Sequence, residues 1–236
     1  MKNSNFIILL SVYALVQVLN VSNAEPYEYM QFVLQYPPGV CYDQSKGHCI
    51  SPLPTKFHVH GIWPSNFSNT LVRCGHALRN NPFHKVQMTP LQTDLGNSWP
   101  SVLTQNNNMQ FWEHEYREHG ACAVESGVPP FTQRSYFEKG HQLWNQYDIL
   151  AVLRQSGIKP GTATSYTMTQ LVTAIQKKIG SNNTPLIMCR RTALGYTLKE
   201  VIICLDHQAT NVISCALNNI RKTDCRDPSG KVYYVA

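Results

Sequence analysis

The sequence predicts an α+β fold, in which a central, mostly antiparallel sheet is flanked by several helices within one disulfide-stapled domain. Segments with strand-like alternation are mixed with amphipathic helical segments, without the regular alternation of strands and helices that builds parallel sheets. Residues 25–236 are long enough to bury one substantial core. Eight cysteines, all in that part of the chain, indicate disulfides formed in an oxidising compartment.

The first 24 residues have the pattern of a secretory signal peptide. Lys2 gives a short positive start, residues 6–19 are mostly apolar, and small side chains at Ser22 and Ala24 predict cleavage after Ala24. We therefore expect a secreted, extracellular protein whose single mature domain is 25–236. No later segment approaches 18 consecutive apolar residues, so we expect no membrane association after cleavage.

The remaining chain can be divided into strands, helices and loops by its hydrophobic pattern. Strands are expected at 29–36, which Pro37 and Pro38 end, and at 57–62, 186–189, 196–205 and 211–215. Helices are expected at 111–119, at 132–147, at 148–153 with Asp148 as the cap, and at 169–179 with Gly180 after the last turn. The polar residues 65–90 are expected to be mostly loop.

Residues 111–122, FWEHEYREHGAC, concentrate acidic and basic side chains. At 100° per residue, the side chains of His114, Glu115, Glu118 and His119 fall within about 140° of one another, so they share one helix face. Gly120 is then expected to end the helix just past His119. Acids and bases on one face suit a site that transfers protons, although a solvated face with pairs four residues apart has the same composition.

A second histidine segment, FHVHGIWP at 57–64, alternates like a strand. Val59 faces one side, and His58 and His60 face the other. A buried polar strand face must find partners, and we assign His58 to a hydrogen-bonded structural role. His60 precedes a glycine and Trp63, so we expect it to project from the strand end into a cleft.

The motif HGIWP at 60–64, followed about 50 residues later by FWEHEYREHGAC, resembles the two active-site signatures of the ribonuclease T2 family. Residues 32–38, FVLQYPP, are similar to the N-terminal strand of that family. The resemblance covers essentially the whole mature chain. It implies a ribonuclease T2-like domain at 25–236 that cleaves single-stranded RNA with little base specificity and needs no metal or other cofactor.

Cleavage of RNA by its own 2′-OH needs a base for that proton, an acid for the 5′-leaving oxygen, and stabilisation of the charged phosphorane between them. Histidines, with pKa values of about 6.5, suit both proton transfers. By the resemblance, His119 is the general base, His60 is the general acid, His114 contacts phosphate, and Glu115 orients a histidine or the phosphorane. The expected product is a 2′,3′-cyclic phosphate, which water later opens to a 3′-phosphate.

Binding of the bases is expected to use aromatic stacking and a few polar groups. Trp63 is a candidate for stacking because it lies beside His60, although a place in the core is equally compatible with its position. By the resemblance, the other substrate-binding positions are Gln35, Ser101, Leu103, Phe111 and the adjoining Trp112. Ser101 stands where some relatives have Asn, which leaves the base preference open.

Glu118 departs from the family pattern, in which this position normally holds a lysine thought to stabilise the phosphorane. An ionised carboxylate at the substrate site opposes the developing negative charge. It is also expected to raise the pKa of nearby histidines. Arg117 starts about 100° away on the helix, so it is poorly placed to replace the lost cation. We therefore expect a reduced rate with the acid–base pair intact.

The sequence alone does not choose among the many pairings that eight cysteines allow. The resemblance implies the disulfides Cys41–Cys49, Cys74–Cys122, Cys189–Cys225 and Cys204–Cys215. Zinc ligation by these cysteines is disfavoured because the chain has no CxxC pair. Asn66 and Asn182 each begin a glycosylation sequon, which fits a secreted protein.

The formal net charge is +6 and the isoelectric point is about 8.9, which favours a polyanionic partner such as RNA. A basic chain with four bridges resembles the S-type ribonucleases of pistil gametophytic self-incompatibility in plants, which meet F-box proteins in pollen. In that reading, residues 65–90 form the variable recognition surface. We expect a monomer.

Three alternatives remain open at this level. One is an S-like ribonuclease of defence or phosphate scavenging, and another is a catalytically weak recognition or storage protein on the same fold. A third is a metallohydrolase that uses His58, His60, His114 and His119. The third lacks the usual helical zinc motif, because His114 and His119 are five residues apart rather than four.

Overall fold

The computed structural model describes residues 27–43, 48–68, 70–127, 131–215, 225 and 230–236. The predicted signal peptide, residues 1–24, and its cleavage site lie outside these described residues. Within them, no helix combines the length and the apolar character that crossing a membrane requires.

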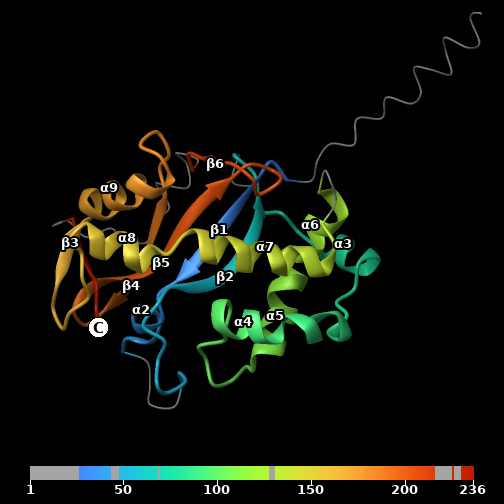
Figure 1. The fold of residues 1–236 in the computed structure, drawn as a ribbon, viewed down its shortest axis with the longest axis horizontal. Helices are drawn as coiled ribbons and strands as arrows, with labels where there is room; N and C mark the ends of the chain where they lie inside the picture. Colours follow the sequence, from blue (N-terminus) through green and yellow to red (C-terminus); the bar gives the residue numbers. More distant parts are fainter. Residues whose placement is uncertain (1–26, 44–47, 69, 128–130, 216–224, 226–229) are drawn as a thin grey trace, which may run out of the picture.

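A seven-stranded sheet forms the centre of the molecule (Figure 1). Strand β1 (Tyr29–Gln35) pairs antiparallel with β2 (His58–Ser65) on one side and with β5 (Gly195–Leu205) on the other. Strand β5 also pairs antiparallel with β4 (Leu186–Thr192) and β6 (Val212–Ile213). It meets β7 (Lys231–Tyr233) in parallel, and β7 pairs with β3 (Ser165–Thr167). The predicted α+β fold with a mostly antiparallel sheet is confirmed.

Helices cover the sheet and extend from one end of it (Figure 1). Helix α7 (Gln133–Gln146) crosses the sheet and contacts β2. Both predicted caps are present. Asp148, at the start of α8 (Ile149–Gln155), accepts a hydrogen bond from the Ala151 N–H, and Gly180, at the end of α9 (Met168–Ile179), has φ +98°. The remaining helical segments are α2 (Pro37–Cys41), α3 (Gly75–Asn80), the 3-10 segment η1 (Lys85–Leu91), α4 (Gln92–Ser98), α5 (Asn108–Glu115), the π-helical segment η2 (Tyr116–Gly120) and α6 (Ala121–Ser126).

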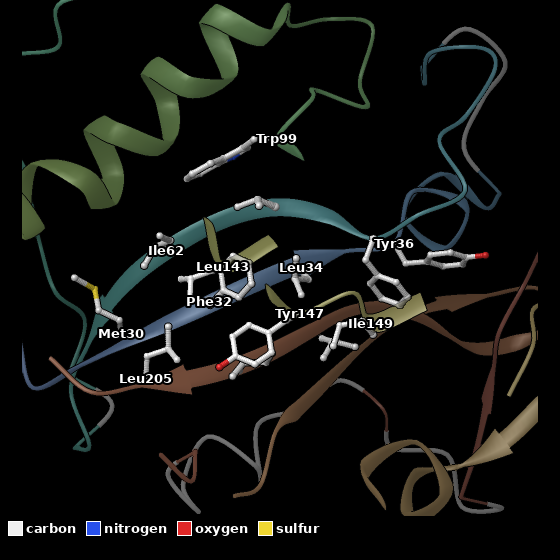
Figure 2. Close-up of a cluster of buried hydrophobic side chains, with 14 of the residues drawn as sticks. Met30, Phe32, Leu34, Tyr36, Ile62, Trp99, Leu143, Tyr147, Ile149 and Leu205 are labelled. Carbon is white, nitrogen blue, oxygen red and sulfur yellow. The ribbon is translucent and has the colours of Figure 1, made fainter. Parts of the chain in front are cut away.

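The two faces of the sheet have different surroundings because side chains alternate along each strand. Met30, Phe32 and Leu34 of β1 point to the larger core, where they meet Leu143 of α7 and Leu205 of β5 (Figure 2). The alternate positions of β1 point to the other face, which holds a smaller apolar cluster made of Tyr29, Val33, Leu186, Ile202, Cys204 and Cys215. That second face also carries the polar residues described below.

Several local predictions are wrong or incomplete. Residues 65–90 are not mostly loop, since they contain α3 and η1; both are short, and neither has the long apolar repeat by which helices are recognised. The short strands β3 and β7 were not predicted, because three residues give no measurable alternation. Pro37 and Pro38 do end β1, but they also begin α2, where proline fits the first helical turn.

Four disulfides join the same pairs that the resemblance implies. They are Cys41–Cys49, Cys74–Cys122, Cys189–Cys225 and Cys204–Cys215, and no described cysteine is free. The Cys74–Cys122 bridge spans 48 residues and ties the start of α3 to α6. It therefore links the segment that follows the HGIWP strand to the helix that follows His119.

Candidate active site

His60 lies at a β-bulge, which turns its side chain out of the regular ladder. Val33 pairs with Gly61 and Leu34 pairs with Val59, so His60 is the extra residue of β2. Bulges of this kind re-aim side chains and are frequent beside active sites. Val59 stays in the core, whereas 27% of the His60 side chain is exposed.

A buried carboxylate holds one nitrogen of His60. The Nδ1 atom of His60 lies 2.7 Å from Oε1 of Glu200, which reaches it from β5 across the intervening strand β1. The Glu200 side chain is only 5% exposed. A second bulge lies beside it, because the register between β4 and β5 skips Lys199. The Lys199 ammonium is 3.5 Å from the second carboxylate oxygen of Glu200.

Glu115 faces the other nitrogen of His60. Its Oε1 is 3.6 Å from His60 Nε2, and its Oε2 accepts a 3.1 Å hydrogen bond from the indole N–H of Trp63. Gly61 lies directly against this pair, since a β-carbon at Gly61 would overlap both the indole nitrogen and the Glu115 carboxylate. The glycine of the motif is therefore required if Glu115 is to reach the histidine.

The histidine helix is longer and less regular than predicted. Helix α5 passes into the π-helical turn η2 and then into α6 without a break. Gly120 has helical angles, φ −61° and ψ −38°, so the prediction that it ends the helix is wrong. A β-carbon on Gly120 would come within 2.6 Å of the Tyr116 ring, so glycine is needed here for close packing.

The four acidic and basic side chains of this helix lie in different surroundings, with Glu115 and His119 against Trp63, and the π-helical turn means that a wheel with a fixed angle of 100° does not describe their directions. Glu115 is buried beside His60, and His114 is exposed and lines the same cleft. His119 lies in a separate hollow, and Glu118 is exposed to solvent.

Trp63 lies between the two histidines proposed for catalysis. Its ring stacks on His119 with centroids 5.0 Å apart and meets His60 edge-on at 5.1 Å. His119 lines a hollow of about 200 Å³ together with Trp63, Gln31 and Asn66. The structure thus brings together the two segments that the sequence singled out, but it places their histidines in adjacent hollows.

The larger cleft has a volume of about 480 Å³ and contains most of the predicted substrate-binding positions. Gln35, Ser101, Leu103 and Phe111 line it together with His60, His114 and Glu115. The amide nitrogen of Gln35 is buried and has no hydrogen-bond partner among the described residues, so a donor is available to a ligand. The Phe111 ring is 5.9 Å from that of His60.

Other residues that line the cleft were not predicted from the sequence. They are Val40, His48, Val102, Gln105, Asn106, Arg190, Lys199 and Glu200. Glu200 gave a usable signal, because it is a carboxylate directly before the apolar residues 201–205 of an expected strand, and a buried charge needs a partner. Arg190 and Lys199 gave none, since charged residues are common in strands.

Two predicted site residues lie elsewhere. Trp112 is 2% exposed and donates its indole N–H to the Trp99 carbonyl, so it belongs to the core; it follows Phe111 on the helix and therefore points about 100° away. Glu118 lines neither hollow and makes no hydrogen bond or ion pair within the described residues. The predicted place of Trp112 in the substrate site is therefore wrong, whereas that of the exposed Glu118 stays a prediction.

His58 is buried and structural, as predicted, but its contacts with the backbone of Asn97 and Ser98 lack good hydrogen-bond geometry. It is 7% exposed, and neither ring nitrogen has a hydrogen-bond partner of good geometry within the described residues. Its ring stacks on Trp144 at 6.1 Å. Burial lowers the pKa of His58 to about 4, although the nearby backbone of Asn97 and Ser98 opposes the shift.

The two site histidines have pKa values that move in opposite directions. Burial lowers the pKa of His119 to about 3, and the positive charges of His60 and His114 add to this effect. Burial also acts against the charge of His60, but the hydrogen bond that His60 donates to Glu200 and the charges of Glu115 and Glu200 outweigh it and raise its pKa. The expectation that Glu118 raises the pKa of nearby histidines is therefore wrong for His119, where burial dominates.

The pKa values of the two carboxylates beside His60 also move in opposite directions. Burial raises the pKa of Glu115, against the opposing effects of His60 and the Trp63 hydrogen bond. Burial acts in the same direction on Glu200, but the hydrogen bond and charge of His60, together with Lys199, lower its pKa. Glu200 is therefore the firmly ionised partner of His60.

The described residues contain no group of three or more His, Cys, Asp or Glu side chains that could hold a metal ion. The four histidines of the metallohydrolase alternative lie apart: His58 is buried against Trp144, and His119 lies in a different hollow from His60 and His114. That alternative has no support in the described structure.

Comparison with known proteins defines the class to which this fold and this site belong. Residues 27–215 match the Ribonuclease T2 family. The chain belongs to the ribonuclease T2 family and is a metal-independent endoribonuclease of that class.

The similar proteins are plant ribonucleases. The chain is 34% identical to ribonuclease S-7 of Nicotiana alata, over 80% of this chain and 82% of that protein. It is 32% identical to extracellular ribonuclease LE of Solanum lycopersicum, over 92% and 93%. Among solved structures, ribonuclease MC1 from bitter gourd seeds has 30% identity and a TM-score of 0.70, over 80% and 94%. The self-incompatibility associated SF11-RNase of Nicotiana alata has 27% identity and a TM-score of 0.73, over 89% and 100%.

Proposed function

We propose that the protein cleaves single-stranded RNA by attack of the ribose 2′-OH, through a 2′,3′-cyclic phosphate to 3′-phosphate ends, with little base specificity. The observation that carries the proposal is the contrast between the two histidines that contact Trp63. His60 lies between two buried carboxylates, whereas no carboxylate pairs with His119 among the described residues. Titratable groups whose pKa values are pushed apart are the usual acid and base of a site.

His60 has the properties of the general acid, and His119 those of the general base. The raised pKa of His60 keeps its imidazole protonated, while the lowered pKa of His119 keeps that ring neutral. A pKa of about 3 makes His119 a weak base in the free protein. A bound phosphate brings negative charge to the ring and raises its pKa towards the working range.

The reaction then follows from these two positions. His119 takes the proton of the 2′-OH as the 2′-oxygen forms its bond to phosphorus. The bond from phosphorus to the 5′-oxygen breaks, and His60 delivers the proton on Nε2 to that leaving oxygen. In the second step the roles reverse: His60 takes a proton from water as the water oxygen attacks phosphorus, the bond from phosphorus to the 2′-oxygen breaks, and His119 protonates that oxygen.

Cationic and acidic groups around the cleft have roles in the same scheme. We assign His114 to contact with the phosphate and Glu115, which is 3.6 Å from His60 Nε2, to the orientation of that ring. Lys199 and Arg190 line the cleft and provide positive charge for the phosphorane. These two cations supply part of the charge that the family lysine would bring to position 118.

Base binding is assigned to Phe111, Leu103 and the polar residues Gln35 and Ser101. Phe111 offers a ring surface, and Gln35 offers the unpaired amide donor. One face of the Trp63 ring is already covered, because it stacks on His119. Variants of ribonuclease MC1 have been solved in complex with 5′-GMP and with 5′-UMP, which supports a substrate of ribonucleotide type.

Glu118 is proposed to reduce the rate rather than to abolish it. It precedes His119 directly, so its negative charge lies near the position assigned to the phosphorane. It is exposed, however, and solvent screens exposed charges. The acid–base pair is therefore expected to remain active, which argues against a recognition or storage protein without catalysis.

The biological role that we propose is that of a secreted S-type ribonuclease in pistil self-incompatibility, acting as a monomer and recognised by pollen F-box proteins. The likeness to ribonuclease S-7 and to SF11-RNase supports this role, as does the basic charge. The likeness to an extracellular ribonuclease of tomato supports secretion and also the second candidate, an S-like enzyme. Glycosylation at Asn66 and Asn182 stays a prediction; Asn182 is exposed, and Asn66 lines the His119 hollow.

The proposed function is tested by cleavage of single-stranded RNA by the purified mature protein, with EDTA present, across pH 4 to 8. We expect a bell-shaped profile, cyclic phosphate as the first product, and loss of activity in His60→Ala and His119→Ala. Inactivity of the folded wild-type protein, or full activity in either variant, would contradict the proposal. Expression confined to the pistil would separate the S-type role from the S-like one.

A further inference from the structure

The contact between His60 and Glu200 is the shortest charged contact in the site, and it is not part of the scheme above. We propose that Glu200 is a positioning residue: its carboxylate holds the His60 imidazole by Nδ1, so that the proton for the leaving oxygen is carried on Nε2. This inference rests on the proposed function, which makes His60 the general acid.

The burial of Glu200 supports the proposal. Burial of a carboxylate costs free energy unless it is paired and hydrogen-bonded, so Glu200 needs partners at this position in the strand. Both of its oxygens are engaged, one by His60 Nδ1 at 2.7 Å and the other by the Lys199 ammonium at 3.5 Å. The position is fixed on both sides, because Glu200 pairs with Gln35 of β1 and with Met188 of β4.

The two β-bulges make this contact possible. His60 is the extra residue of β2, and Lys199 is the extra residue of β5, so each strand departs from regular pleating at the site. Strand β1 lies between these strands, and His60 and Glu200 meet across it. Bulges re-aim side chains in this way.

Glu115 is the other carboxylate beside His60, but it has a different place. It faces Nε2, the nitrogen that must meet the leaving oxygen, and it already accepts the indole N–H of Trp63. A substrate therefore displaces the Glu115 contact from the reacting nitrogen, whereas the Nδ1 contact behind the ring persists. Only Glu200 can hold His60 throughout the reaction.

The other charged groups around His60 have to be considered in any test by pH. Lys199 opposes the proton on His60, and Glu115 favours it. His114, His48 and Arg190 line the same cleft, and His119 lies beyond Trp63. A change at Glu200 acts on His60 against this background, so the test needs a readout that is specific for the acid.

The experiment compares Glu200→Gln and Glu200→Asp with the wild-type protein and with Glu138→Gln, a surface control on α7. Glutamine keeps the size and an acceptor oxygen but removes the charge. Each protein is assayed on a dinucleoside monophosphate and on uridine 3′-(4-nitrophenyl phosphate), over the full pH range. The nitrophenolate leaves without a proton, so that substrate does not need a general acid.

We expect Glu200→Gln to lower kcat/KM on the dinucleotide by about 10- to 100-fold, and on the nitrophenyl ester by no more than about threefold. The basic limb of the pH profile should move down by about one unit. Glu200→Asp should recover part of the loss, and Glu138→Gln should match wild type. Equal losses on both substrates, or an unmoved basic limb, would show a merely structural role and overturn the proposal.

Proton NMR of the histidine rings separates this inference from the proposed function. The His60 resonance, assigned by its absence in His60→Ala, should titrate at lower pH in Glu200→Gln than in wild type. This readout needs no catalysis, so it also tests a Glu200→Gln protein that is inactive. An unchanged His60 titration would overturn the positioning role even if RNA is cleaved, whereas an inactive wild-type protein with a shifted titration would contradict the proposed function alone.

Discussion

His58 should make the protein less stable in acid. Burial lowers the pKa of its imidazole to about 4 in the folded protein, whereas the unfolded chain has the ordinary value of about 6.5. Between these two values the unfolded state binds more protons than the folded state, so the free energy of unfolding rises with pH across this window. As the pH falls from 6.5 to 4, protonation of this one group in the unfolded state lowers the free energy of unfolding by about 3 kcal/mol.

The test is the free energy of unfolding in urea, measured with the disulfides intact at a series of pH values from 7 to 4. In His58→Phe, the apolar ring fills a similar volume, and the part of the acid destabilisation that is due to His58 should disappear. The variant should keep most of the wild-type stability at pH 7, because the ring volume is kept and the contacts of His58 with the backbone of Asn97 and Ser98 lack good hydrogen-bond geometry. His84→Gln, at an exposed histidine, is the matched control and should keep the wild-type slope. A His58→Phe slope equal to that of wild type would refute the assignment.

Three further variants test the site. Gly61→Ala should cost about 1–3 kcal/mol of stability and most of the activity, because its β-carbon overlaps Trp63 and Glu115; wild-type activity with unchanged thermal unfolding would contradict the packing argument. Glu118→Lys should raise kcat/KM by about three- to tenfold at low salt and less at high salt, with Glu138→Lys as the control; no gain would mean that the charge at 118 does not limit the rate. Phe111→Ala should raise KM for dinucleotides, corresponding to a loss of about 1–3 kcal/mol for one stacked base; an unchanged KM would remove Phe111 from the base site.

The sequence predicted the elements that have strong local patterns. The strand at 29–36 and the helices at 132–147 and 169–179 are present because their apolar periodicity or their caps are local properties. The weak elements, such as α3 and β7, depend on tertiary contacts and carry no such pattern. The mixed result at 111–122 has a physical cause, since a π-helical turn is set by packing around Tyr116 and Gly120, which a wheel with a fixed angle does not represent.

The same distinction applies to the site. His60, His114, Glu115 and the cleft positions Gln35, Ser101, Leu103 and Phe111 could be named from the sequence because they lie in recognisable motifs. Glu200 was missed because it belongs to no motif, and its partner is 140 residues away in the chain. The error at Trp112 is different: adjacent residues on a helix point in different directions, so one of two aromatic neighbours lies in the core.

The position of Trp63 between two hollows has a consequence for the direction in which a strand can bind. On the proposed roles, the nucleoside that supplies the attacking 2′-OH lies on the His119 side, and the nucleoside that departs lies on the His60 side. The scissile phosphate must then sit near the edge of the indole, and the strand can run past it with only one polarity. The two hollows differ in lining, one rich in residues of 63–66 and 70–72 and the other in residues of 101–106, so the two nucleosides of a dinucleotide meet different surroundings. A dinucleotide XpY and its reversed sequence YpX are therefore different substrates for this enzyme.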